Sequence, residues 1–184
     1  MQISAEDSVL IIIDVQEKLF AVVNEQDRLV RNLIKLIRTC KLLDIPIIIT
    51  EQYPRGIGHT IEVIKQELGD AYCPIEKTSF SCFGCPEFER RLLELGRRTL
   101  LLTGIELHIC VYQTAIDALV RGYKPVVIYD ATSSRLRPDY EVCLHRLLHK
   151  GVDVATTDMI IFELLKDASH PKFKDVLKIV KELA

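Results

Sequence analysis

Apolar residues follow two alternating patterns along the chain. Short continuous apolar runs are typical of buried strands in a parallel sheet, whereas apolar positions three or four residues apart are typical of amphipathic helices. The runs predict strands over residues 9–13, 47–50, 71–75, 99–103, 125–130 and 152–156. Helical spacing predicts helices over residues 26–43, 61–68, 87–96, 109–121, 140–150 and 159–184, the last with a break near residues 170–171.

The alternation of strands and helices indicates the class of fold. No internal repeat or linker-like segment interrupts it, so residues 1–184 are predicted to form a single domain. Such an alternation builds a parallel sheet that is covered by helices on both faces. We therefore predict an α/β fold: a three-layer α/β/α arrangement with a six-stranded parallel sheet in the Rossmann-like order 3-2-1-4-5-6.

Composition and charge exclude several classes of partner. The chain is 48% apolar and 27% charged, as in folded globular proteins. Its formal net charge is −2 and no basic block stands out, so we expect no nucleic-acid partner. The first residues lack a basic region and no apolar run approaches bilayer length. We therefore expect no signal peptide, no membrane partner and a cytoplasmic location, where cysteines are mostly reduced.

Two chemically reactive side chains fall where predicted strands end. Asp14 follows the first apolar run directly, and Cys110 lies at the start of the helical pattern after the fourth run. In the predicted order these two strands are neighbours where the winding of the sheet reverses, which is where ligands bind in such folds. A helix start also favours a thiolate, because unpaired N–H groups and the helix dipole stabilise negative charge. The plain alternatives are an ordinary buried thiol and a carboxylate that caps a turn.

Four segments, in the same order along the chain, resemble the isochorismatase-like cysteine hydrolase family, which includes nicotinamidases. VLIIIDVQEKLF fits the family's first strand with its terminal Asp, and EKTSFSCF fits the segment with its catalytic Lys. LLLTGIELHICVYQTAIDAL fits the signature around the catalytic Cys, and VVIYDATSSR fits the next strand. The loop EQYPRGIG and the Gly-Ile-Glu before the cysteine are similar to those of isochorismatase domain-containing proteins.

This resemblance implies a catalytic triad of Asp14, Lys77 and Cys110. It also implies a cis peptide bond before Glu106, and an oxyanion hole formed by the backbone N–H groups of Glu106 and Cys110. Cys110 would attack a small amide or amide-like substrate, Asp14 would accept the thiol proton, and Lys77 would keep Asp14 ionised and lower the thiol pKa. Because the third strand is not next to the first, Lys77 would have to reach the site from a loop.

Further side chains near these positions are candidates for a substrate pocket: Gln16, Phe20, Phe80, His108 and Tyr112. His108 also has the chemistry of an alternative base, and aromatic residues at such positions are often plain core.

We expect no metal and no other cofactor. Nicotinamidases carry an Asp/His metal cluster after the second strand, where this chain has Glu51 and His59 but no second His. Cys82 and Cys85 have the spacing of one zinc-ligand pair, but a second pair is missing. We interpret these two cysteines as structural or incidental.

The sequence thus predicts a cysteine hydrolase that acts on C–N bonds other than peptide bonds, in a small-molecule substrate. The alternative is a catalytically silent family member that serves as an interaction protein, because a fold does not determine a function. A true isochorismatase is disfavoured, since that activity typically has a residue other than cysteine at the position of Cys110. The resemblance also suggests a homo-oligomer, in which the apolar tail helices would pack on a second subunit or on their own sheet.

Overall fold

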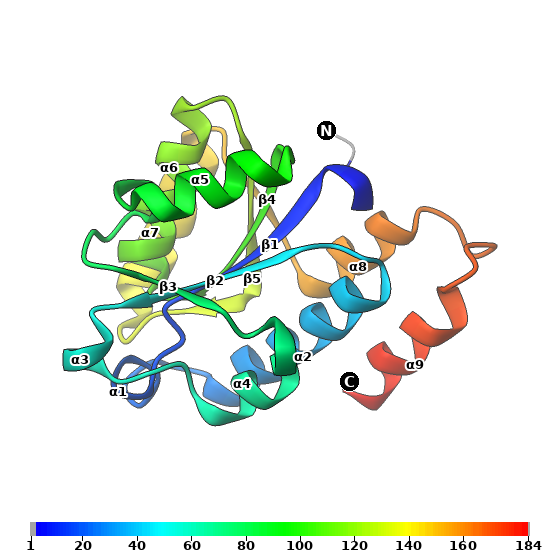
Figure 1. Ribbon diagram of the computed structural model, residues 1–184, viewed down its shortest axis with the longest axis horizontal. Helices are drawn as coiled ribbons and strands as arrows, with labels where there is room; N and C mark the ends of the chain where they lie inside the picture. The colour runs from blue at the N-terminus through cyan, green and yellow to red at the C-terminus, as the bar shows by residue number, and fades with distance from the viewer. Residues whose placement is uncertain (1–2, 184) are drawn as a thin grey trace.

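The computed structural model describes residues 3–183, and within them the strands form one six-stranded parallel sheet (Figure 1). The strands are β1 Ser8–Ile13, β2 Ile47–Gln52, β3 Pro74–Lys77, β4 Thr99–Ile105, β5 Lys124–Ser133 and β6 Asp153–Ala155. Their order is β3-β2-β1-β4-β5-β6, and every neighbouring pair is parallel. The predicted fold class and strand order are confirmed.

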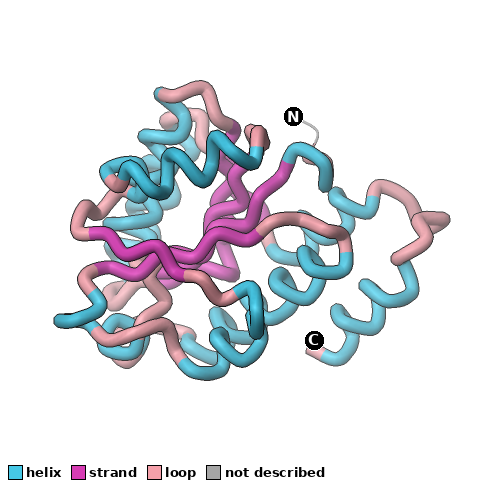
Figure 2. Tube along the Cα trace, in the orientation of Figure 1, coloured by secondary structure: helices cyan, strands magenta, loops and turns pink. Residues whose placement is uncertain are grey.

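Helices cover both faces of the sheet (Figures 1 and 2). One face carries α2 Gln26–Leu42, α4 Glu62–Leu68, α8 Thr157–Leu165 and α9 Phe173–Glu182. The other face carries α5 Pro86–Leu95, α6 Tyr112–Val120 and α7 Arg137–His149. Two short helices, α1 Glu17–Phe20 and α3 Pro54–Ile57, lie in the loops after β1 and β2 and were not predicted from the sequence.

The central strand β1 shows why the sheet needs continuous apolar runs. Leu10 and Ile12 pack in the apolar cluster on one face, while Val9, Ile11 and Ile13 pack in the cluster on the other. Successive side chains of a strand point to opposite faces, so a strand with helices on both sides buries every residue. All of β1 is accordingly buried.

The close approach of β1 and β4 requires a glycine at position 104. Ile13 and Gly104 are paired in the parallel register, and Gly104 has a φ of +103°. A Cβ at this position would collide with the Ile13 carbonyl oxygen and lie 2.7 Å from the Ile13 nitrogen. Only glycine combines this backbone conformation with this spacing. The glycine therefore keeps the end of β1, and Asp14 after it, close to the segment that follows β4.

The third strand differs from the prediction. The sequence predicts it over residues 71–75, but β3 spans Pro74–Lys77, and a 3₁₀ turn, Gly69–Ala71, precedes it. It is an edge strand that pairs only with β2. An edge strand tolerates a proline at its start and charged residues, so it lacks a clear apolar run. Lys77 is consequently the last residue of a strand, and the expectation that it reaches the site from a loop is wrong.

The tail helices pack on their own sheet. Ile160, Ile161 and Leu164 of α8 and Val176 of α9 are buried in the same apolar cluster as α2. These four side chains are therefore covered within the chain, whereas Met159 and Phe162 of α8 are exposed. Ala184, the last residue of the predicted tail helix, lies outside the described residues. None of the helices between residues 3 and 183 combines the length and apolarity needed to cross a membrane.

Candidate active site

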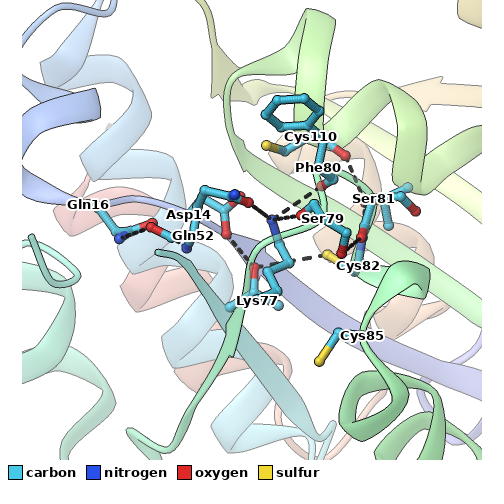
Figure 3. Close-up of polar contacts among 12 residues, drawn as sticks. Asp14, Gln16, Gln52, Lys77, Ser79, Phe80, Ser81, Cys82, Cys85 and Cys110 are labelled. Atoms are coloured by element: carbon cyan, nitrogen blue, oxygen red, sulfur yellow. Dashed lines mark hydrogen bonds and ion pairs between the residues drawn. The ribbon is translucent and has the colours of Figure 1, made fainter. Parts of the chain in front are cut away.

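Asp14, Lys77 and Cys110 come from three different strand ends at the carboxyl edge of the sheet. Asp14 follows β1 with a φ of +52°, Lys77 ends β3, and Cys110 lies in a π-helical turn, Leu107–Val111, between β4 and α6. The Lys77 Nζ atom lies 2.6 Å from Oδ2 of Asp14, and both side chains are fully buried. The charges of both groups act on the Cys110 thiol, and Figure 3 shows the three side chains in one view. The three side chains predicted to act together thus lie in one cluster.

Four acceptors surround the Lys77 ammonium. Besides Asp14, Nζ donates to Oε1 of Gln52 at 2.8 Å and to the carbonyl oxygens of Ser79 and Phe80, each at 3.2 Å (Figure 3). Burial has the largest single effect and would lower the pKa of Lys77, but the Asp14 carboxylate, together with smaller contributions from Cys82 and Cys110, raises it overall. Lys77 therefore stays charged at neutral pH, with its three protons directed at these acceptors.

Asp14 is held on both oxygens. Lys77 binds Oδ2, and the Thr50 hydroxyl donates to Oδ1 at 2.7 Å. Thr50 is fully buried on β2, and its carbonyl also accepts the backbone N–H of Asp14 at 3.1 Å. A buried carboxylate needs such partners, since an unpaired buried charge is costly. The carboxylate is thus oriented before any substrate binds.

The surroundings of Cys110 favour the thiol form, contrary to the expectation of a thiolate. Burial raises the pKa of the Cys110 thiol, the negative charge of Asp14 raises it further, and the Lys77 ammonium offsets only part of this increase. The side chain is only 5% exposed. The expectation considered the helix start, but loss of hydration and a neighbouring carboxylate outweigh that effect. Lys77 does lower the thiol pKa, as predicted, without making it a thiolate.

Glu106 lies at the end of β4, and its peptide bond with Ile105 is cis. Its side chain is 4% exposed and accepts the backbone N–H of Arg135 at 2.9 Å through Oε2. This contact ties the segment that leads to Cys110 to the loop after β5.

Of the five pocket candidates, two have structural roles that the sequence did not indicate. Gln16 is fully buried, and its side-chain amide pairs with both backbone groups of Gln52: Nε2 donates to the carbonyl at 2.9 Å, and Oε1 accepts the N–H at 2.6 Å. Nε2 also donates to the carbonyl of Gly58. The Tyr112 ring packs against the apolar cluster and lies beneath the Arg146 guanidinium. The Gln16 amide is thus engaged within the protein, whereas the Tyr112 ring is partly buried.

The other three candidates differ in exposure. Phe20 is partly buried against the cluster that contains α2. His108 faces the loop after β5, with Nδ1 2.9 Å from the Ser134 hydroxyl. Phe80 is 52% exposed, while its carbonyl oxygen binds Lys77. Phe80 is therefore the pocket candidate that joins the cluster to the surface.

Glu51, which is buried, and His59, which is exposed, form a separate contact rather than a metal centre. Oε2 of Glu51 lies 3.0 Å from Nδ1 of His59, and Oε1 accepts hydrogen bonds from Thr60 and from the hydroxyl of Tyr72. Burial alone would raise the pKa of Glu51, but these hydrogen bonds outweigh burial and lower it. Over residues 3–183, no group of three or more His, Cys, Asp or Glu side chains could hold a metal ion.

Cys82 and Cys85 are free thiols, and they differ in their exposure to solvent. Cys82 is fully buried next to Thr50, whereas Cys85 is partly exposed and lines a cavity of about 430 Å³. The lining of this cavity includes Lys77 and Tyr53 but neither Asp14 nor Cys110.

Sequence reasoning missed Thr50 and Gln52, which hold Asp14 and Lys77. Both lie on β2, between β1 and β3, so any contact between Asp14 and Lys77 has to cross this strand. The available signal was the polar end of β2: Thr50, Glu51 and Gln52 continue the strand directly after its apolar residues. Buried polar residues in this place need partners, and here the partners are the charged side chains of the site.

The fold and this cluster define a class: three-layer α/β proteins with an aspartate, a lysine and a cysteine gathered where the sheet reverses its winding. The sequence model of the isochorismatase domain matches residues 8–159. The chain is 38% identical to isochorismatase domain-containing protein 2A of Mus musculus over 183 residues, which is 98% of this chain and 86% of that protein.

Two further proteins extend the comparison. Isochorismatase domain-containing protein 1 of Salmo salar is 40% identical over 82% of this chain, which spans about half (52%) of that protein. The solved structure of MAR1 ribonuclease from Caenorhabditis elegans superimposes with a TM-score of 0.91 at 35% identity, covering 98% of this chain and 93% of that one. The chain belongs to the isochorismatase family, and this membership supports a hydrolase activity.

Proposed function

We propose that the protein hydrolyses a C–N bond other than a peptide bond, in a small amide or amide-like substrate. Cys110 is the nucleophile, and Asp14 and Lys77 complete the triad. The observation that carries this proposal is the fully buried Lys77–Asp14 ion pair in electrostatic contact with the Cys110 thiol. A buried ion pair is weak evidence of stabilisation, so its place beside a potential nucleophile supports a chemical role.

The first half of the reaction forms a thioester. As the Cys110 sulfur attacks the amide carbonyl carbon, its proton passes to the carboxylate of Asp14. The tetrahedral intermediate then expels the amine, which takes the proton from Asp14, and the acyl group remains on the sulfur. Since the resting sulfur is a thiol, proton transfer accompanies attack and does not precede it.

The second half regenerates the thiol. Asp14 accepts a proton from water as the water attacks the thioester carbonyl, and the proton returns to the departing sulfur. The products are a carboxylic acid and the free thiol. In both halves, the backbone N–H groups of Glu106 and Cys110 are proposed to stabilise the negative oxygen of the intermediate.

Lys77 has an electrostatic role in this scheme. Its three protons already point at four acceptors, so it does not supply a proton to the leaving group. It orients Asp14 through the ion pair, and it opposes the rise of the thiol pKa. Asp14 therefore carries the proton in both halves of the reaction.

The experiment measures ammonia release from a panel of small primary amides, together with intact-protein mass spectrometry. We expect turnover of at least one amide and an acyl adduct on Cys110 in acid-quenched samples. Cys110→Ser and Asp14→Asn should reduce turnover at least about 100-fold, since each removes one member of the triad. Cys40→Ser is the matched control, because Cys40 is also buried but lies on α2, on the opposite face of the sheet.

A short RNA incubated under the same conditions tests a different activity. The C. elegans relative is named a ribonuclease, whereas the net charge of −2 does not favour RNA binding by this chain. RNA cleavage that Cys110→Ser abolishes, without turnover of any amide, would overturn the proposal.

A further inference from the structure

The two carbonyl oxygens that bind Lys77 belong to a short loop after β3. We call residues 78–82 the lysine loop. The carbonyls of Ser79 and Phe80 each lie 3.2 Å from the Lys77 Nζ atom. At its start the loop is fixed to β2, because Nε2 of Gln52 donates to the carbonyl of Thr78 at 2.7 Å. The position of the ammonium therefore depends on where this backbone is held.

Two side chains of α6 hold the far end of the lysine loop. The Thr114 hydroxyl oxygen accepts the backbone N–H of Cys82 at 3.0 Å, and a carboxylate oxygen of Asp117 accepts the Ser81 hydroxyl at 2.6 Å. Thr114 is fully buried, whereas the side chain of Asp117 is 41% exposed. The loop thus rests on the helix that starts directly after the turn containing Cys110.

Thr114 is also bonded to the nucleophile's own backbone. Its hydroxyl donates to the carbonyl oxygen of Cys110 at 2.7 Å, one helical turn earlier. A hydroxyl has one proton and two lone pairs. Here the Thr114 hydroxyl donates its proton to the carbonyl oxygen of Cys110, and its oxygen accepts the backbone N–H of Cys82 in the lysine loop. One atom therefore links the part of the chain that carries the thiol to the part that encloses the ammonium.

We propose that Thr114 is a positioning residue that fixes the Cys110 thiol relative to the Lys77–Asp14 pair. This inference rests on the proposed function and adds a residue outside the triad. Thr114 touches neither the thiol nor the two charged groups, so it acts only through the backbone of Cys110 and the lysine loop. Proton transfer and nucleophilic attack require groups held to within fractions of an ångström, and a shift of about 1 Å can reduce a rate about 100-fold.

Valine has nearly the shape of threonine and lacks the hydroxyl. Thr114→Val therefore leaves the Cys82 N–H buried without its acceptor, and the lysine loop has to shift to find another. Thr114→Ser retains the hydroxyl. We expect the reactivity of Cys110 to fall about 10-fold or more in the valine variant and to be largely retained in the serine variant.

The readout is the ratio of two alkylation rates. Cys73 and Cys85 are replaced by serine in all proteins, because these thiols are exposed or partly exposed. Iodoacetamide labelling of Cys110 and Cys143 is then followed by peptide mass spectrometry between pH 6 and pH 9. Cys143 is buried as well, and burial raises the pKa of its thiol to about 12. A merely loosened fold would accelerate labelling of both thiols, whereas lost positioning slows Cys110 alone.

Ser81→Ala provides a second variant, at a buried residue whose hydroxyl also accepts the backbone N–H of Phe83. It removes the contact with Asp117, and we expect a smaller, severalfold decrease in the labelling ratio. If Thr114→Val does not fold, Ser81→Ala still tests the inference. An unchanged ratio in folded Thr114→Val, or in Ser81→Ala when the valine variant is unfolded, would overturn the inference. In the parent protein Cys110 should label faster than Cys143, because Asp14 can accept its proton during alkylation. Equal labelling of the two thiols would instead refute the proposed function itself, and the inference with it.

Discussion

Replacing Lys77 by methionine removes the cation from a buried ion pair and leaves the anion in place. Methionine fills a similar volume, but Asp14 retains only the Thr50 hydroxyl as a side-chain donor. The acceptors Gln52, Ser79 and Phe80 lose their shared proton donor. Breaking a buried pair by removal of one partner costs about 3–5 kcal/mol. Because both side chains are fully buried, we expect Lys77→Met to lower the free energy of unfolding by about 4 kcal/mol.

Urea unfolding at pH 7, followed by circular dichroism, measures this loss. For a chain of this length, about 4 kcal/mol corresponds to a decrease of about 8–16 °C in the melting temperature. Asp14→Asn/Lys77→Met should be more stable than Lys77→Met alone, since the double variant contains no unpaired buried charge. A loss below about 1 kcal/mol in Lys77→Met, or a double variant equal to the sum of its single changes, would refute the view of Asp14 and Lys77 as a coupled pair.

Other consequences of the structure can be measured in the same way. Gly104→Ala should lower the free energy of unfolding in urea by at least about 3 kcal/mol, because the new Cβ meets the backbone of Ile13. Gly96→Ala, whose Cβ meets no atom within 4 Å, should cost about 1 kcal/mol. Equal losses in the two variants would contradict the close approach of β1 and β4. The lowered pKa of Glu51 means that its ionised form contributes stability above about pH 4.5 that is lost as the pH falls through the lower folded value. Glu51→Gln should therefore flatten the decline of the urea midpoint between pH 5 and pH 2.5, and Tyr72→Phe should flatten it less. An unchanged slope in Glu51→Gln would refute this contribution of Glu51 to stability. Sedimentation velocity over a range of concentrations tests the predicted homo-oligomer, and a monomer throughout would refute it.

Most of the fold could be predicted because the sheet is buried on both faces. The runs at β1 and β4 contain almost only apolar residues, which follows from their central places in the sheet. β3 lacked this signal since it lies at the edge, and its residues Glu76 and Lys77 are charged. The short helix Pro54–Ile57 was missed because the segment is rich in proline and glycine, which usually mark loops.

The candidate site was predicted less completely than the fold. The resemblance to a family supplied Lys77, whose side chain crosses the end of β2 to reach Asp14, and no local pattern reveals such a contact. The prediction that Cys110 is a thiolate was wrong for a related reason. The helix start is visible in the sequence, whereas burial of the sulfur and its neighbouring carboxylate depend on the packing of distant segments. Gln16 shows the same limit, since its pairing with Gln52 joins the segment after β1 to the end of β2.

The protonated state of Cys110 has a consequence for the durability of the protein. Peroxides attack thiolates far more readily than thiols, and they attack accessible sulfur more readily than enclosed sulfur. Cys110 is only 5% exposed, and its raised pKa favours the thiol over the thiolate. A molecule built this way should survive oxidative stress with its reactive sulfur intact, while the outlying Cys73 is consumed first.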